Sequence, residues 1–136
     1  MNNYPLPAVG VFIFKGNAIY LVKKGRGIFK DKWITPGGKI EYGEYILDTV
    51  HREVKEETNL DICNIEFVTY EQTIEYDDNH NVVRHYVFFN FKANAMDGHP
   101  IANDDAAEIK LVPFSELKNL DINEPTIRTL KSMGIY

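Results

Sequence analysis

The segment from Arg52 to Glu57 carries the residues best suited to chemistry. It reads Arg-Glu-Val-Lys-Glu-Glu, so Glu53, Glu56 and Glu57 fall at positions i, i+3 and i+4. On a helix these positions share one face, with Cβ atoms about 5–6 Å apart. Like charges at this spacing destabilise an isolated helix, and anions are unfavourable near a helix C-terminus. A bound divalent cation would reverse both penalties, so the cluster indicates metal binding.

The spacing around this cluster distinguishes a metal site from an ordinary solvated helix face. Five residues separate Gly38 from Glu44, seven separate Glu44 from Arg52, and the run ends with Thr-Asn-Leu at Leu60. This pattern resembles the Nudix box, and its one departure is Asn59, where the box has glycine. Because asparagine tolerates the left-handed backbone conformation, we expect the turn after the helix to be kept.

The resemblance implies a metal-dependent hydrolase that acts on diphosphates. Magnesium prefers oxygen ligands and keeps several waters, and Mn²⁺ is the alternative ion. Arg52 is expected to orient a neighbouring carboxylate through a bidentate contact. Glu44 is expected to accept N–H bonds at the helix start or to assist the metal cluster. The expected metal ligands are the carboxylates of Glu53, Glu56 and Glu57 and the backbone carbonyl of Gly38.

The implied reaction also needs a base. Water attacks a phosphorus atom of the diphosphate, and a carboxylate takes the proton of that water. Nudix enzymes supply this carboxylate either from the box or from a later loop. The candidates are Glu53 and Glu56 in the box and Asp104, Asp105 and Glu108 in a later acidic segment.

Cations and aromatic residues near the box are candidate contacts for the substrate. Arg26 and Lys39 are expected to reach the phosphates, and Gly37 permits a close approach to the backbone. Tyr86 is expected to flank a nucleobase, since aromatic rings stack on bases without hydrogen-bond readout. Further aromatic candidates are Phe29, Tyr76 and His85.

Segments outside the box favour one substrate class. Residues 84–89 and 103–108 resemble those of small ADP-ribose pyrophosphatase-like Nudix proteins. We therefore expect a nucleoside diphosphate linked to a moiety such as ribose. Residues 123–125, Asn-Glu-Pro, also occur in MutT-like proteins, so a nucleoside triphosphate pyrophosphohydrolase is the alternative. A third hypothesis, a Nudix-fold nucleotide-binding regulator without turnover, is less favoured because such proteins typically lose box glutamates.

Two helices are expected to support these residues. The first runs from Glu44 to Thr58, with an apolar stripe of Ile46, Leu47, Val50 and Val54 for packing on a sheet. The second is expected to start at Asn123 as N-cap, with proline near its first position, and to reach about Met133. A short helical turn is expected around residues 115–117.

Runs rich in β-branched and aromatic residues predict the strands. A short strand from Trp33 is expected to enter a tight turn at Gly37 and Gly38, after a basic loop from Lys23 to Lys32. Strands paired by turns with interspersed helices indicate an α/β (α+β) fold with a mixed sheet. The resemblance implies the Nudix αβα sandwich. The longer strands are expected at residues 8–14, 18–22, 65–75, 82–92 and 109–112.

Length and charge limit the classes of partner. With 136 residues, we expect one Nudix domain over residues 1–136. A net charge of −5 without a basic tract argues against a nucleic-acid polymer as partner. No apolar run is long enough for a bilayer, and residues 1–7 lack a signal-peptide pattern, so a cytoplasmic enzyme is expected. Cys63 lies in an alternating run and is expected in or near a strand. The resemblance leaves a homodimer open, since many relatives dimerise.

Overall fold

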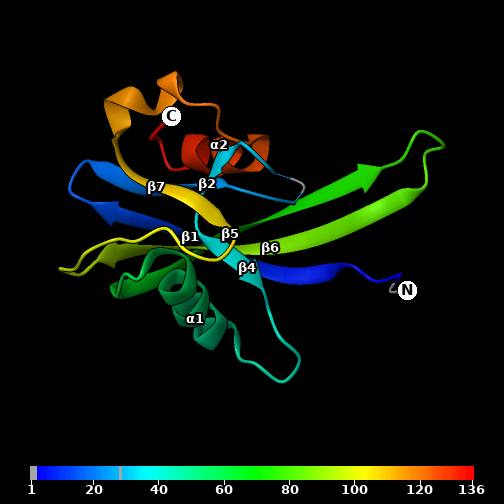
Figure 1. Ribbon diagram of the computed structural model, residues 1–136, viewed down its shortest axis with the longest axis horizontal. Coiled ribbons are helices and arrows are strands. Elements are labelled where there is room, and N and C mark those ends of the chain that lie inside the picture. Colours follow the sequence, from blue (N-terminus) through cyan, green and yellow to red (C-terminus); the bar gives the residue numbers. More distant parts are fainter. Residues whose placement is uncertain (1–2, 28) are drawn as a thin grey trace.

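The computed structural model describes residues 3–27 and 29–136 (Figure 1). Met1 and Asn2, at the start of the N-terminal segment, and Ile28, within the predicted basic loop, lie outside the described residues. The strands are β1 (Leu6–Lys15), β2 (Ala18–Lys24), β3 (Trp33–Ile34), β4 (Gly37–Lys39), β5 (Ile62–Tyr76), β6 (Val82–Ala95) and β7 (Ala106–Pro113). The helices are α1 (Ile46–Thr58), the 3-10 helix η1 (Phe114–Asn119) and α2 (Glu124–Ser132).

Strand β1 lies inside a mixed sheet with the order β3-β2-β1-β6-β5. It runs parallel to β6, in a register that aligns Ala8 with Phe88 and Gly10 with Asn90. On its other edge it pairs antiparallel with β4 and then with β2. Strand β7 pairs with β2. The predicted mixed sheet is therefore confirmed.

The two faces of β1 pack against different helical layers. Successive side chains of a strand point to opposite faces. Val9 and Val11 therefore join Val50 and Val54 of α1 in one core cluster, whereas Phe12 packs in a second cluster on the other face. Figure 1 shows α1 on one side of the sheet and η1 and α2 on the other. This arrangement confirms the predicted αβα sandwich. The second cluster includes Ile19, Leu21, Trp33, Val112, Leu117, Ile122 and Leu130.

The buried face of α1 differs from the predicted apolar stripe. Val50 and Val54 are fully buried as expected, but Ile46 and Leu47 are 38% and 52% exposed. Three polar residues, Thr49, Glu57 and Thr58, are buried on this helix. The reason is that all three have hydrogen-bond partners: Thr49 donates to Glu44, Glu57 accepts the N–H of Gly37, and Thr58 donates to the carbonyl of Val54. The helix thus buries part of its polar face.

Both helices end or begin as their sequences predict. Asn59 has φ 60° and ψ 14°, the left-handed conformation, and its N–H donates to the Lys55 carbonyl. The asparagine that departs from the box pattern therefore still terminates the helix. At the start of α2, the Asn123 side chain accepts a hydrogen bond from the N–H of Thr126 at 3.2 Å. This is the predicted N-cap.

Gly37 and Gly38 form strand β4 rather than the predicted tight turn. They pair with Gly10 and Val9 of β1, and neither has a positive φ. Their lack of a side chain serves close approach instead. A Cβ atom on Gly37 would overlap the backbone carbonyl of Val9, and one on Gly38 would overlap the carboxyl group of Glu53.

The later strands are longer than predicted. Strands β5 and β6 form a long hairpin that projects beyond the rest of the sheet (Figure 1). Cys63 lies in β5, as expected. Strand β7 begins at Ala106 and includes Glu108, which was predicted as part of a loop. Within the described part of the chain, no helix is both long and apolar enough to cross a bilayer.

Candidate active site

The backbone of the two glycines in strand β4 lies against two glutamate side chains of helix α1. The N–H of Gly37 donates to Glu57 Oε1 at 2.7 Å, and Glu57 is 2% exposed. The Glu53 carboxylate lies directly over Gly38, in space that a side chain at that position would fill. The glycine pair therefore lets two carboxylates of α1 approach the backbone of β4.

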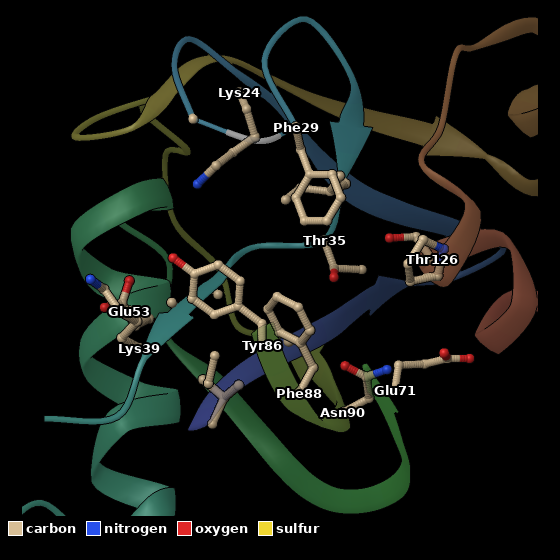
Figure 2. Close-up of a pocket in the computed structure, with 18 of the residues that line it drawn as sticks. Lys24, Phe29, Thr35, Lys39, Glu53, Glu71, Tyr86, Phe88, Asn90 and Thr126 are labelled. Carbon is tan, nitrogen blue, oxygen red and sulfur yellow. The ribbon is translucent and has the colours of Figure 1, made fainter. Parts of the chain in front are cut away.

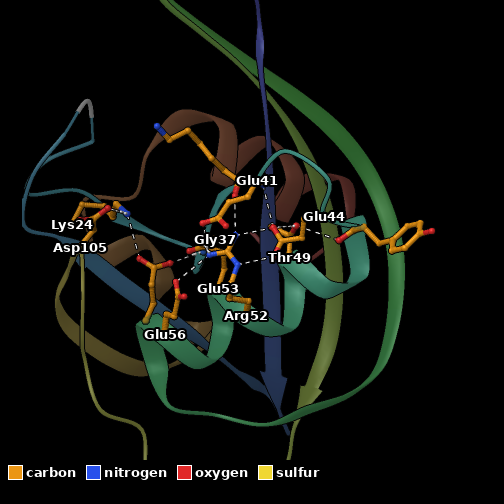
Figure 3. Close-up of polar contacts among 12 residues, drawn as sticks. Lys24, Gly37, Glu41, Glu44, Thr49, Arg52, Glu53, Glu56 and Asp105 are labelled. Atoms are coloured by element: carbon orange, nitrogen blue, oxygen red, sulfur yellow. Dashed lines mark hydrogen bonds and ion pairs between the residues drawn. The ribbon is translucent and has the colours of Figure 1, made fainter.

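Arg52 connects the glutamates of this segment (Figure 3). Its Nε and Nη2 donate to the two carboxylate oxygens of Glu44 at 2.7 and 2.9 Å. Its Nη1 lies 2.8 Å from Glu53 Oε1 and 3.2 Å from Glu56 Oε2. Arg52 thus makes the bidentate carboxylate contact that the sequence predicted.

Glu44 has a different environment from the one expected. It lies before the first residue of α1, and the N-cap, Tyr45, makes no side-chain cap bond. Its Oε1 accepts from Thr49 Oγ1 at 2.6 Å and from the Glu41 N–H at 3.1 Å. The hydrogen bonds from Arg52 and then from Thr49 lower the pKa of Glu44 to about 2. Glu44 is therefore ionised near neutral pH and anchors Arg52, and it does not act as the N-cap of α1.

Burial changes the protonation of the other two carboxylates. Burial raises the pKa of Glu53 from 4.5 to about 7, against the opposing hydrogen bond from Arg52. The neighbouring charges of Glu57 and Glu56 raise it further. Burial also raises the pKa of Glu57, and Lys24 and the Gly37 N–H oppose that rise. Burial therefore disfavours the ionised form of both carboxylates, so Glu53 and Glu57 need compensating positive charge nearby when they are ionised.

A basic cluster faces these carboxylates from the end of β2. Lys24 Nζ lies 3.3 Å from Glu57 Oε2 and 4.0 Å from Asp105 Oδ2. Arg26, in the loop after β2, pairs with the same aspartate. Figure 3 shows Lys24 and Asp105 side by side, away from Arg52 and on the other side of the glutamates.

A cavity of about 670 Å³ opens beside this cluster. Its floor is formed by alternate residues of β6: Arg84, Tyr86, Phe88 and Asn90. In Figure 2 the Tyr86 hydroxyl points to the side on which Glu53 and Lys39 lie, and the Phe29 ring lies across from Tyr86 and Phe88. Glu53 lines the cavity although α1 packs on the opposite face of the sheet. Polar residues from the other end of the cavity are Thr35, Glu71, Asn123 and Thr126.

The structure gathers most of the residues selected from the sequence. Three of them, Arg52, Glu56 and Glu57, do not line the cavity but lie next to Glu53 on α1. Asp104 and Glu108 do not line it either, and both are exposed, whereas Asp105 does line it. Of the additional aromatic candidates, Phe29 lines the cavity, but Tyr76 and His85 do not. The other selected residues that line the cavity are Arg26, Gly37, Gly38, Lys39, Glu53 and Tyr86.

Sequence reasoning missed several lining residues that carry polar or aromatic groups. Phe88 and Asn90 follow Tyr86 at steps of two, so the alternation of β6 could have identified them. Glu71 has no such local signal, because its position depends on the pairing of β5 with β6 opposite Phe88. It is held in place by Arg128 of α2, with Nη2 2.9 Å from Glu71 Oε2.

The donor set of α1 and β4 fits a hard divalent cation. Carboxylate oxygens are preferred ligands of Mg²⁺, and the side-chain-free Gly38 lets the Glu53 carboxylate lie against the backbone of β4. Among residues 3–27 and 29–136, no three acidic, histidine or cysteine side chains are already gathered as a metal cage. Arg52 and Lys24 hold the glutamate oxygens instead. The oxygen groups are therefore of the type that a divalent cation prefers. In this structure the positive charges of Arg52 and Lys24 pair with them.

Comparison with known proteins identifies the family. A family model described as the NUDIX domain matches residues 4–132. The chain is 31% identical over 124 residues to an ADP-ribose pyrophosphatase of Methanocaldococcus jannaschii, covering 91% of this chain and 71% of that protein. It is 27% identical over 131 residues to the nucleoside triphosphatase NudI of an Enterobacter species, covering 90% and 93%. The chain spans between 55% and 93% of the length of the first curated relatives that it matches.

A solved structure supports the same fold. The MutT NUDIX hydrolase from Burkholderia pseudomallei superposes with a TM-score of 0.84 at 22% identity, covering 95% of this chain and 98% of that one. At this identity the likeness concerns the fold. Together with the family match over residues 4–132, it shows that the chain belongs to the Nudix hydrolase family.

Proposed function

We propose that this Nudix hydrolase uses Mg²⁺, or Mn²⁺ in its place, to hydrolyse a nucleoside diphosphate linked to a second group, with ADP-ribose as the representative substrate. One observation carries the proposal: Glu53 reaches past Gly38 to one end of a cavity whose floor carries Tyr86 and Phe88. If the diphosphate binds at the carboxylate end, the attached nucleoside lies along Tyr86 and Phe88, where its base can stack on an aromatic ring.

Some residues of the box are proposed to bind the ion, and others are proposed to position those ligands. The carboxylates of Glu53, Glu56 and Glu57 and the carbonyl of Gly38 are the proposed ligands. When bound, the ion neutralises phosphate oxygens and lowers the pKa of a coordinated water. Arg52 keeps Glu53 and Glu56 within reach through contacts of 2.8 and 3.2 Å.

Glu53 is the proposed base. It lines the cavity, whereas Glu56 does not, so its carboxylate can come within reach of a water beside the bound substrate. The water proton passes to a Glu53 carboxylate oxygen as the water oxygen bonds to phosphorus, and the bond from that phosphorus to the bridging oxygen breaks. Asp104 and Glu108 stand further from this role because neither lines the cavity.

The charges around the cavity suit a substrate with a short phosphate chain. Four cations line it, and four acidic residues offset them. Arg26 and Lys39 are the proposed phosphate contacts, and Gly37, which also lines the cavity, is the proposed backbone neighbour of the phosphates. A diphosphate carries less negative charge than a triphosphate, so it fits this balanced lining better. The cations are Lys24, Arg26, Lys39 and Arg84, and the acids are Glu41, Glu53, Glu71 and Asp105.

A nucleoside triphosphate is the second candidate substrate. Asn123 and Pro125, from the run also found in MutT-like proteins, line the cavity at its far end. The similarity to NudI extends over 90% of the chain, which adds support. This enzyme would release the monophosphate and pyrophosphate.

A substrate panel tests the proposal. ADP-ribose, a nucleotide sugar, a dinucleoside polyphosphate and the nucleoside triphosphates would each be incubated with enzyme and Mg²⁺, and products separated by ion exchange. We expect AMP and ribose 5-phosphate from ADP-ribose at the highest kcat/KM. A preference for a triphosphate would favour the second candidate. Binding without turnover on every member would contradict both and favour the regulator.

A further inference from the structure

Lys24 reaches the buried carboxylate of Glu57 from across the site. Its Nζ lies 3.3 Å from Glu57 Oε2, and the side chains of Lys24 and Glu57 are 15% and 3% exposed. The other oxygen of Glu57 accepts the Gly37 N–H at 2.7 Å. An ionised carboxylate this buried is costly unless it is paired, and Lys24 is the cation that pairs with it.

The backbone directs Lys24 to this position. In the pairing of β2 with β7, Lys23 lies opposite Glu108 but Lys24 lies opposite Ala106, so Ala107 is an extra residue. Such bulges redirect side chains at the ends of paired strands. Hydrogen bonds of 3.1 and 2.9 Å to Lys32 and Asp31 hold the Lys24 backbone. The ammonium group is thus built into the site.

A divalent cation at Glu57 would compete with Lys24. Both would bind the same carboxylate oxygen, and like charges repel at such short range. Lys24 has other anions within reach: Asp105 Oδ2 is 4.0 Å away, and the ammonium borders the cavity that would hold the phosphates. In Figure 2 the Lys24 side chain extends from β2 toward this space.

We propose that Lys24 is a tethered counter-ion: it holds Glu57 in the metal-free protein, leaves when a divalent cation binds there, and then binds the substrate diphosphate. This inference rests on the proposed function, because it takes Glu57 as a metal ligand. Lys24 then opposes metal binding when no substrate is present and supports substrate binding once the metal is in place. It therefore makes the two ligands bind more cooperatively.

Mn²⁺ binding without nucleotide tests the first half. Free Mn²⁺ would be measured by electron paramagnetic resonance with wild type, Lys24→Met and Lys23→Met. Lys23 is the matched control, since it removes the same charge one residue away and does not line the cavity. We expect Lys24→Met to tighten Mn²⁺ binding on the order of tenfold, the effect of removing one charge about 6 Å from a divalent ion in a water-like dielectric. Lys23→Met should change it much less, and Lys24→Arg should restore weak binding.

Nucleotide binding at saturating Mn²⁺ tests the second half. The probe is the α,β-methylene analogue of ADP, measured by calorimetry. Lys24→Met should weaken its binding severalfold, while Lys23→Met should not. An analogue affinity unchanged in Lys24→Met would overturn the phosphate role.

The outcomes separate this inference from the proposed function. Mn²⁺ binding by wild type with equal or weaker binding by Lys24→Met would overturn the counter-ion role alone. Absence of Mn²⁺ binding by wild type would overturn the proposed function and the inference with it. Circular dichroism would show whether the variants fold. If Lys24→Met does not fold, Lys24→Gln would be used in its place.

Discussion

Arg52 holds both carboxylate oxygens of Glu44, with Nε 2.7 Å from Oε2 and Nη2 2.9 Å from Oε1. The remaining edge of the guanidinium contacts Glu53 and Glu56. Glu44 and Arg52 are eight positions apart in the chain, and Glu44 lies before the first residue of α1, yet the two side chains make a bidentate pair. The pair aligns two proposed metal ligands without itself lining the cavity.

Breaking this pair should lower activity non-additively. We expect Glu44→Gln and Arg52→Gln each to reduce kcat/KM by roughly 10- to 100-fold, because each frees Glu53 and Glu56 from their orientation. The kcat/KM of the double variant should be only slightly lower than that of the less active single variant. Arg52→Lys should not restore activity, since an ammonium group cannot bind a carboxylate through two parallel bonds. Steady-state kinetics would measure this, with Lys55→Gln as control on the same helix. Fully multiplicative effects would argue against a single unit.

The two glycines of β4 should fail in different ways. A Cβ atom at Gly37 overlaps backbone, so Gly37→Ala should destabilise the protein by at least about 2 kcal/mol. At Gly38 the three nearest atoms belong to the Glu53 side chain, which can rotate away. Gly38→Ala should therefore keep most of its stability and lose most of its activity. Urea unfolding and kcat would be measured on both variants. Equal loss of stability in the two would contradict this distinction.

The stability of the metal-free protein should depend on Glu53 ionisation. Its pKa is about 7 in the folded protein, against 4.5 without the fold, so ionisation favours unfolding. The stability gained from protonated Glu53 is complete below pH 4.5 and is lost as the pH rises through 7. With chelator present, we compare the free energy of unfolding of Glu53→Gln with that of wild type. This difference should shift in favour of the variant by about 1–3 kcal/mol between pH 4.5 and pH 8. Urea unfolding at the two pH values checks this. The same stability difference at both would show that burial does not shift Glu53.

The position of the base can be tested by matched substitutions. Glu53→Gln should lower kcat at least about a hundredfold, within the range for loss of a general base. Asp104→Asn and Glu108→Gln should each leave kcat within about twofold, since both side chains are exposed and outside the cavity. If either lowered kcat as much as Glu53→Gln while Mn²⁺ affinity stayed unchanged, the base would belong to the acidic segment instead.

Local patterns predicted the helices and most strands well. The box spacing placed the glutamates on one helix, and Asn59 could be recognised as its left-handed end, because both depend on residues close in sequence. The N-cap Asn123 was predictable for the same reason. The exposed Ile46 and Leu47 were not, since hydrophobicity alone does not show that α1 turns Thr49 and Glu57 inward.

The site beyond the box depended on long-range pairing. Lys24 contacts Glu57 because of a bulge between β2 and β7, which no local pattern reveals. The same pairing extends β7 back to Ala106 and places Glu108 in that strand, outside the cavity lining. Glu71 enters the cavity through the register of β5 and β6. The cluster of glutamates on α1 was therefore predictable from the box, whereas the walls of the cavity required the fold.

The most direct test of the central claim is hydrolysis of ADP-ribose in oxygen-18-labelled water, followed by phosphorus NMR and mass spectrometry, with and without Mg²⁺. We predict AMP and ribose 5-phosphate, one of them labelled, only when Mg²⁺ is present. Glu57→Gln should lose at least about a hundredfold in rate while keeping its fold, because the ion loses a buried ligand worth several kcal/mol. Equal rates with chelator, or wild-type rates in Glu57→Gln, would contradict the assignment of the glutamates of α1 as a metal site.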